Sequence, residues 1–260
     1  MIKGDNLMRK AYVLLGMVMA LTLVFCPGSA QALMWVGAQG GVNVLANTDV
    51  DVNVFGSTFT AHDVRFDNPQ AIGGLQIGYA FVKEGFLGYN YPEWMKYFAF
   101  IVDFTYNTYE VRSQDVSVTG ISPEDGEKVA QFLGNKMHIS TAKGMMAVMS
   151  FLFMGRYGFF PDSEVPFGRL QPYVAVGPGV AFTSLDPGAG IGTTSSVDVA
   201  LVTEGGVRWM ALKNVALDAA FRYRWFEPKF TFTSAALGNV TVKPDAIHSF
   251  TALFRVSYLF

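Results

Sequence analysis

The sequence contains one cysteine in 260 residues, Cys26. A lone cysteine forms no intrachain disulfide, and cysteine-based metal sites need several thiolates. Charge is also scarce: 15% of residues are charged, against ~25% in soluble domains. The 19 basic and 21 acidic residues leave no positive excess to meet phosphates, so we expect no nucleic-acid partner.

Long apolar runs are missing from most of the chain. After Phe25 no stretch of 18 apolar residues occurs, so we expect no membrane-spanning helix beyond that point. Aromatic residues, in contrast, make up 15% of the sequence, and 27 residues are glycine. This combination with low charge argues against intrinsic disorder.

The first 32 residues have the features of a cleaved signal peptide. Three basic residues open the segment: Lys3, Arg9 and Lys10. An uncharged apolar run follows over residues 11–25, and Ala30 and Ala32 form the small-x-small pattern of a signal-peptidase site. We therefore predict cleavage after Ala32 and one domain over residues 33–260. Cleavage would remove Cys26 and leave 16 basic and 20 acidic residues.

Two alternatives for this segment are weaker. A membrane anchor needs ~20 apolar residues, and this run has 15. A lipidated Cys26 would follow a small residue, but Phe25 is large.

The rest of the chain alternates between apolar and polar residues, which is typical of β-strands. The last strand is the clearest. One of its faces is apolar: Phe250, Ala252, Phe254, Val256, Tyr258 and Phe260. The other face is mostly polar and includes Arg255. About 9–11 tilted residues cross a bilayer as a strand, so this segment is long enough.

Seven earlier segments give eight strands in total. They are residues 35–45, 75–81, 98–107, 142–157, 170–182, 197–209 and 215–225. We predict an all-β fold, an eight-stranded antiparallel up-and-down transmembrane β-barrel. A soluble sandwich or lipocalin-type barrel is the alternative. The membrane barrel is favoured because small residues crowd the polar faces and aromatics cluster at the ends of the apolar ones.

The connections between strands alternate in length and predict an orientation. The longer or more polar set is 46–68, 112–138, 186–195 and 228–245; the other set is 83–94, 159–168 and 211–214. Long loops of such barrels lie outside the cell, so both mature termini are expected in the periplasm. Residues 123–133 have the pattern of a short loop helix.

Eight charged residues fall on the inward faces of the predicted strands: Asp103, Asp198, Glu204, Arg208, Asp218, Arg222, Arg224 and Arg255. Isolated charges in a narrow interior are costly, so we expect them to pair. Arginine suits such pairs because its planar fork donates two hydrogen bonds to one carboxylate. The hypothesis is a closed network that plugs the barrel.

Two segments resemble the small outer-membrane β-barrel superfamily that includes the OmpA transmembrane domain and opacity-type surface proteins. Residues 254–260 resemble its C-terminal assembly signal, and residues 171–180 resemble its fifth strand. The resemblance implies a Gram-negative outer membrane, contact with lipid and lipopolysaccharide, and recognition by the barrel-assembly machinery. The assembly residues it implies are Phe254, Val256, Tyr258 and Phe260.

Catalytic chemistry is not indicated. His62, His138 and His248 share no metal-ligand spacing, and His248 and Ser249 point to opposite faces of a strand, which precludes a paired role there. We expect no catalytic, cofactor or metal site and no enzyme activity. The leading hypothesis is a structural or adhesin-like surface role through the outer loops, with a host or cell-surface ligand. The alternatives are a small channel and a lipid A-modifying enzyme.

Overall fold

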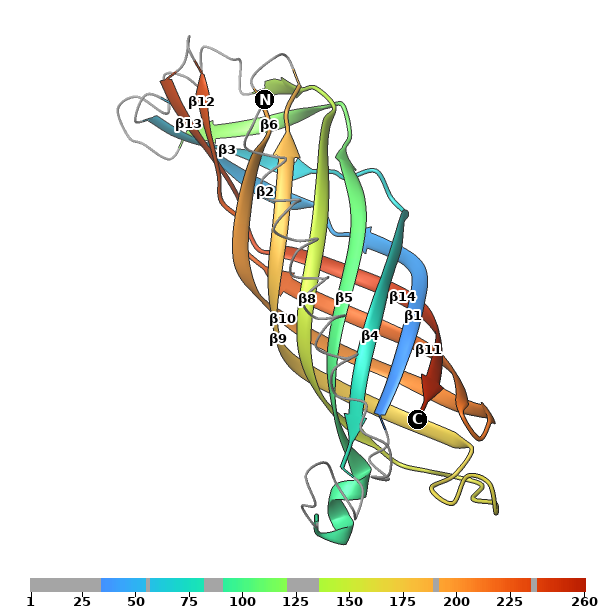
Figure 1. Cartoon of the computed structure of the whole chain (residues 1–260). Helices are drawn as coiled ribbons and strands as arrows, with labels where there is room; N and C mark the ends of the chain where they lie inside the picture. Colours follow the sequence, from blue (N-terminus) through green and yellow to red (C-terminus); the bar gives the residue numbers. More distant parts are fainter. Residues whose placement is uncertain (1–33, 55–56, 82–90, 121–135, 189–191, 235–237) are drawn as a thin grey trace.

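The computed structural model describes residues 34–54, 57–81, 91–120, 136–188, 192–234 and 238–260 (Figure 1). The predicted signal peptide, with Ala30 and Ala32, lies outside the described residues. So does the predicted loop helix at 123–133. No helix in the described part of the chain is long and apolar enough to span a membrane.

Eight strands close into an antiparallel barrel, as the sequence predicts. In order around the barrel they are β1 (Met34–Leu45), β14 (Ile247–Leu259), β11 (Val215–Phe226), β10 (Thr194–Leu212), β9 (Leu170–Asp186), β8 (Ala142–Arg156), β5 (Phe98–Val111) and β4 (Gln70–Ala80). Every neighbouring pair is antiparallel. The predicted fold class is therefore confirmed.

Burial alternates along each barrel strand. On β14, Phe254 is 71% exposed and Tyr258 is 53% exposed, whereas Arg255 between them is 2% exposed. The exposed side chains on the outer wall are apolar, and polar and charged side chains are buried in the lumen. This is the inverse of a soluble barrel and matches a wall that faces lipid.

Three of the four long connections contain strands, so the prediction of loops there is wrong. Parts of 46–68, 112–138 and 228–245 form a second, six-stranded sheet. Its order is β12 (Phe230–Ser234), β13 (Gly238–Pro244), β2 (Thr48–Val54), β3 (Ser57–Val64), β6 (Gln114–Gly120) and β7 (Lys136–Ile139). Apolar and polar residues do alternate in these segments, for example at Val50 and Val52. The polar residues between the apolar ones make each segment look like a polar loop.

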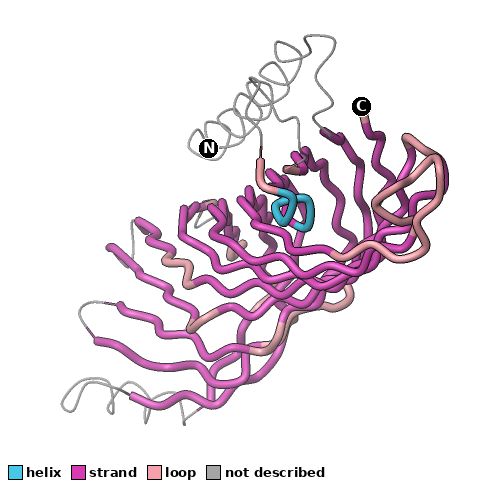
Figure 2. The backbone as a smooth tube through the Cα atoms, turned by 90° about the horizontal axis from the view of Figure 1, so that it is seen from below, coloured by secondary structure: helices cyan, strands magenta, loops and turns pink. Residues whose placement is uncertain are grey.

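The two ends of the barrel differ. The six-stranded sheet extends from one end, here called the sheet end, and the C-terminus lies at the other, the terminal end (Figure 1). Met34 and Phe260 exchange backbone hydrogen bonds at the terminal end. A short 3-10 helix, η2 (Glu93–Tyr97), precedes β5 and is the cyan segment in Figure 2.

Candidate functional site

A buried ion-pair network crosses the middle of the lumen. At its centre is Glu204 of β10, which is 4% exposed. Arg255 of β14 donates to both Glu204 oxygens, at 2.7 and 2.6 Å. Arg222 of β11 donates through Nε to Glu204 Oε2 at 2.7 Å. One carboxylate therefore joins two arginines from different strands.

The network also spans the full width of the barrel. Arg222 forms a two-bond contact with Asp103 of β5, at 2.6 and 3.0 Å. Gln39 of β1 donates to Asp103 and accepts from Arg255 Nε at 2.7 Å, which closes a ring of side chains. Tyr173 of β9 accepts from Arg255 and donates to Glu204. Six of the eight barrel strands contribute a member.

A second ion pair lies nearer the terminal end. Arg208 Nε and Nη2 donate to the two oxygens of Asp218, at 2.7 and 3.1 Å, and both side chains are almost fully buried. The guanidinium of Arg208 lies 4.4 Å from the centre of the Trp35 ring. Such stacking is favourable for a desolvated arginine.

Two of the eight predicted residues lie outside these clusters, so the prediction of one closed network is wrong. Arg224 is fully buried but its hydrogen bond is to a neutral group, Thr105 Oγ1, at 2.8 Å. Its Nε and Nη1 have no hydrogen-bond partner among the described residues. Asp198 also has a buried oxygen without a partner there. The register explains this, because Asp198 lies beyond the last pair of β10 with β11.

Three lumen residues were not part of the predicted charge network. Gln39 and Tyr173 complete the central ring, and Arg156 donates to Gln171 at 3.2 Å and lies 4.5 Å from the Phe167 ring. Period-2 alternation places Gln39 and Tyr173 on inward faces, so the pattern could have identified them. Arg156 ends the methionine-rich strand β8, whose alternation is weak.

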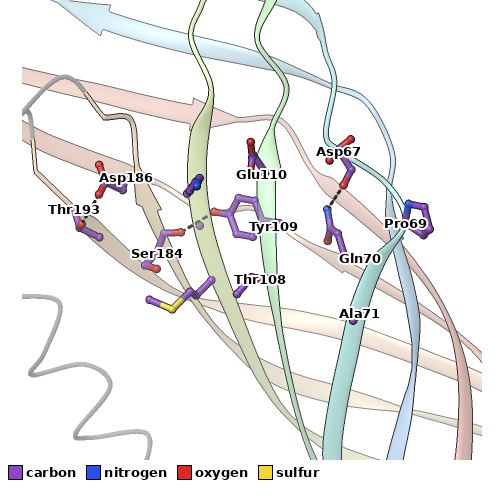
Figure 3. A pocket seen from close by; sticks show the side chains of 13 residues that line it. Asp67, Pro69, Gln70, Ala71, Thr108, Tyr109, Glu110, Ser184, Asp186 and Thr193 are labelled. Carbon is purple, nitrogen blue, oxygen red and sulfur yellow. Dashed lines mark hydrogen bonds between the residues drawn. The ribbon is translucent and has the colours of Figure 1, made fainter.

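A neutral polar layer lies between the network and the sheet end. Gln70 accepts from Asn43 and Asn107, while Ser249 and Thr251 donate to Asn43. Above it, the Tyr109 hydroxyl donates to the Ser184 carbonyl oxygen at 2.9 Å, passing over β8 (Figure 3). Gln70, Tyr109 and Ser184 border a pocket of about 600 Å³ near the rim.

The remaining predicted residues lie away from the lumen. Phe254, Val256, Tyr258 and Phe260 are exposed on the outer wall at the end of β14. The three histidines are separate from one another: His62 contacts Asp49, His138 contacts Asp115, and His248 contacts Tyr223. Within the described ranges, no three histidine, cysteine or acidic side chains gather as metal ligands.

No family model and no curated protein sequence matches this chain. Several solved structures are similar to it. OprG, an outer membrane protein from Pseudomonas aeruginosa, is 16% identical, with a TM-score of 0.52 over 90% of this chain and 98% of OprG. The outer membrane protein AlkL is 16% identical, with a TM-score of 0.46 over 90% and 93% of the two chains.

Neisserial surface protein A is 13% identical, with a TM-score of 0.40 over 86% of this chain and 96% of that protein. At these identities the similarity concerns the fold alone. The chain has the fold of the small eight-stranded outer-membrane β-barrels, which is the architecture that the sequence analysis expects.

Proposed function

We propose that this protein is a non-conducting outer-membrane barrel that holds its six-stranded sheet outside the cell as an interaction surface, without catalysis. The observation that carries the proposal is the contact of Arg222 with both Asp103 and Glu204, all buried in mid-lumen. An eight-stranded barrel is just wide enough to be filled by its own side chains. A lumen crossed over its full width by ion pairs suits a structural scaffold better than a pore.

The outer wall supports membrane insertion. Val174, Val199 and Phe254 are 69%, 75% and 71% exposed, although all three are apolar. A continuous apolar wall of this kind is unfavourable in water and stable in lipid. The partners proposed for the wall are therefore outer-membrane lipid and lipopolysaccharide, and the barrel-assembly machinery during biogenesis.

The difference between the two ends of the barrel supports the proposed orientation. The sheet end carries the six-stranded sheet, whereas the terminal end has the short connection at Lys213 and Asn214 between β10 and β11. Short turns face the periplasm in bacterial barrels, so the sheet is proposed to face the medium, where a host or cell-surface ligand could reach it.

Two measurements test the proposal. An epitope tag after Thr58 should be accessible to antibody on intact cells, and a tag after Glu164 only after permeabilisation; the opposite pattern would reverse the orientation. Purified protein in planar bilayers should show no stable conductance steps. Large steps from the wild type would support the channel alternative instead.

Absence of catalysis is tested separately. Mass spectra of lipid A from cells with and without the gene should be identical. A mass change that depends on the gene would favour the lipid A-modifying alternative over a surface role.

A further inference from the structure

The buried charges of the lumen do not balance. Among the described residues, three carboxylates are buried inside the barrel: Asp103, Glu204 and Asp218. Five arginines are buried with them: Arg156, Arg208, Arg222, Arg224 and Arg255. The interior therefore holds a surplus of positive charge, which is costly to bury without a counter-ion.

One arginine carries this surplus in the deep interior. Each carboxylate already accepts at least two hydrogen bonds from other arginines: Asp103 from Arg222, Glu204 from Arg222 and Arg255, and Asp218 from Arg208. Arg156 and Arg224 are left over. Arg156 ends β8 at the terminal rim, is 7% exposed and lies against the Phe167 ring. Arg224 is 0% exposed, so water does not screen its charge.

Arg224 cannot release its charge, because a guanidinium stays protonated in proteins even where a lysine would not. Its Nη2 donates to Thr105 Oγ1 at 2.8 Å, while Nε and Nη1 have no acceptor in the described part of the chain. The register partners of Arg224 and Thr105 are Val202 on β10 and Val148 on β8. Both valines are buried and offer no polar atom, so the strands alongside leave these N–H groups unsatisfied.

Asp198 does not supply the missing negative charge. It lies four residues along β10 from Val202, the register partner of Arg224, which is a span of ~13 Å. One Asp198 oxygen is itself buried without a partner among the described residues, which shows that the two groups do not meet. The counter-ion of Arg224 therefore has to come from outside the chain. One unpaired positive charge matches a monovalent anion, whereas a divalent anion would leave a buried negative charge.

Hydroxyl donors lie on the wall opposite Arg224. Thr105 Oγ1 accepts from Arg224 and keeps its own proton to donate. Ser150 of β8 is buried, and its Oγ has no described partner. It is two residues from Val148, which faces Thr105, and is thus a diagonal cross-strand neighbour of Thr105. A guanidinium and hydroxyl donors are the groups that hold a small anion.

We propose that the lumen binds one small monovalent inorganic anion, such as chloride, beside the Arg224 guanidinium. Two residues nearer the terminal end, Arg222 and Asp103 close the lumen. The anion therefore enters past the polar layer of Asn43 and Gln70 and is held there, not passed through the barrel. The site requires neither the outward orientation of the six-stranded sheet nor a ligand for that sheet, so it goes beyond the proposed function.

Urea unfolding of the full chain in lipid vesicles tests the site, with sodium chloride replacing sodium gluconate at constant ionic strength. Gluconate has the same charge but is too large to lie within the lumen. A ligand that binds only the folded state lowers the unfolding constant by the factor 1 + [L]/Kd. We expect about a tenfold fall at a chloride concentration ten times the dissociation constant. An unfolding constant that stays the same throughout the exchange would overturn the proposal.

A matched pair of variants at position 105 assigns the effect to Arg224. Thr105→Asp places a carboxylate against the guanidinium and should remove the chloride response, whereas the isosteric Thr105→Asn leaves the charge unbalanced and should retain it. Arg224→Gln should also remove the response, and Arg112→Gln, at an exposed ion pair, should retain it. The pair at position 105 decides the question even if Arg224→Gln does not fold. Equal responses in Thr105→Asp and Thr105→Asn would contradict the site.

Bromide locates the ion directly. Crystals grown in sodium bromide should show an anomalous difference peak beside Nε or Nη1 of Arg224, and this peak should be absent from Thr105→Asp crystals. Peaks confined to exposed arginines such as Arg112 would rule out the lumen site. A bilayer without conductance steps, together with no chloride response, would reject the anion but leave the proposed function intact.

Discussion

Arg222 and Asp103 lie on β11 and β5, which are four strands apart in a ring of eight, and they form a two-bond ion pair across the lumen. Two residues further along the same strands, Arg224 and Thr105 repeat the contact with a neutral acceptor. Side chains of β5 and β11 thus connect opposite walls of the barrel at two successive levels, one by an ion pair and one by a single hydrogen bond.

Replacing the central arginine should be strongly destabilising. Arg222→Ala leaves Asp103 without its only two-bond partner and Glu204 with one arginine fewer. Removing one member of a buried ion pair costs roughly 3–5 kcal/mol. Urea unfolding in lipid vesicles measures the loss. Arg112→Ala, which breaks an exposed pair with Asp67, is the control and should cost about 0–1 kcal/mol. Equal losses would contradict a dry lumen.

A carboxylate at position 105 should stabilise the barrel. Arg224 is buried and its only described acceptor is Thr105 Oγ1, so Thr105→Asp supplies the missing counter-charge. Relative to the isosteric Thr105→Asn, we expect a gain of about 1 kcal/mol or more from the charge-assisted contact. The gain should disappear when Arg224→Ala is combined with Thr105→Asp. A Thr105→Asp variant less stable than Thr105→Asn would show that Arg224 is already neutralised.

Gly144 should tolerate no side chain. A Cβ there would overlap the Tyr109 ring and approach the Ser184 carbonyl, because the tyrosine crosses β8 at this glycine. Overpacking a well-filled interior costs roughly 1–3 kcal/mol, so Gly144→Ala should lower the unfolding midpoint. Tyr109→Ala in the same chain should recover part of that loss. Additive losses in the double variant would argue against the overlap.

The end of β14 is expected to direct assembly. Tyr258 and Phe260 are exposed on the outer wall at the terminal end, where aromatic side chains suit the lipid–water interface. Changing both to serine should reduce the folded, heat-modifiable band on gels. Trp225→Ser, on the same wall at the other end, is the control and should fold normally. An unchanged folded band in the double variant would remove the role proposed for these residues.

The contact between β2 and β3 should weaken in acid. The Asp63 backbone N–H donates to Asp49 at 2.9 Å and, with the His62 side chain, holds the pKa of Asp49 below its ordinary value. The stability that ionised Asp49 contributes to this contact is therefore complete above its unfolded pKa of about 3.9. It is lost as pH falls through the lower pKa of the folded state. Hydrogen exchange at the Asp63 amide reports it.

Asp49→Asn is the matched variant for this measurement. It should exchange faster than wild type near neutral pH, and the difference should shrink below about pH 4. A difference that is constant across this pH range would rule out titration of Asp49 as the cause.

Sequence alone determined the barrel. Alternation along β14, with Phe254 outward and Arg255 inward, follows from the two-residue period of a strand, which needs no tertiary information. The same period places Asp103, Glu204 and Arg222 on inward faces. An apolar wall opposite a polar one then indicates lipid outside, because only a membrane makes that arrangement stable.

Only the tertiary structure decided which inward residues meet. Arg222 and Asp103 are 119 positions apart, and their contact depends on the stagger of eight strands, which no local pattern encodes. The same stagger leaves Asp198 beyond the reach of the arginines. The outer sheet likewise required the fold, because segments such as β2 and β13 become strands by pairing with each other across most of the chain.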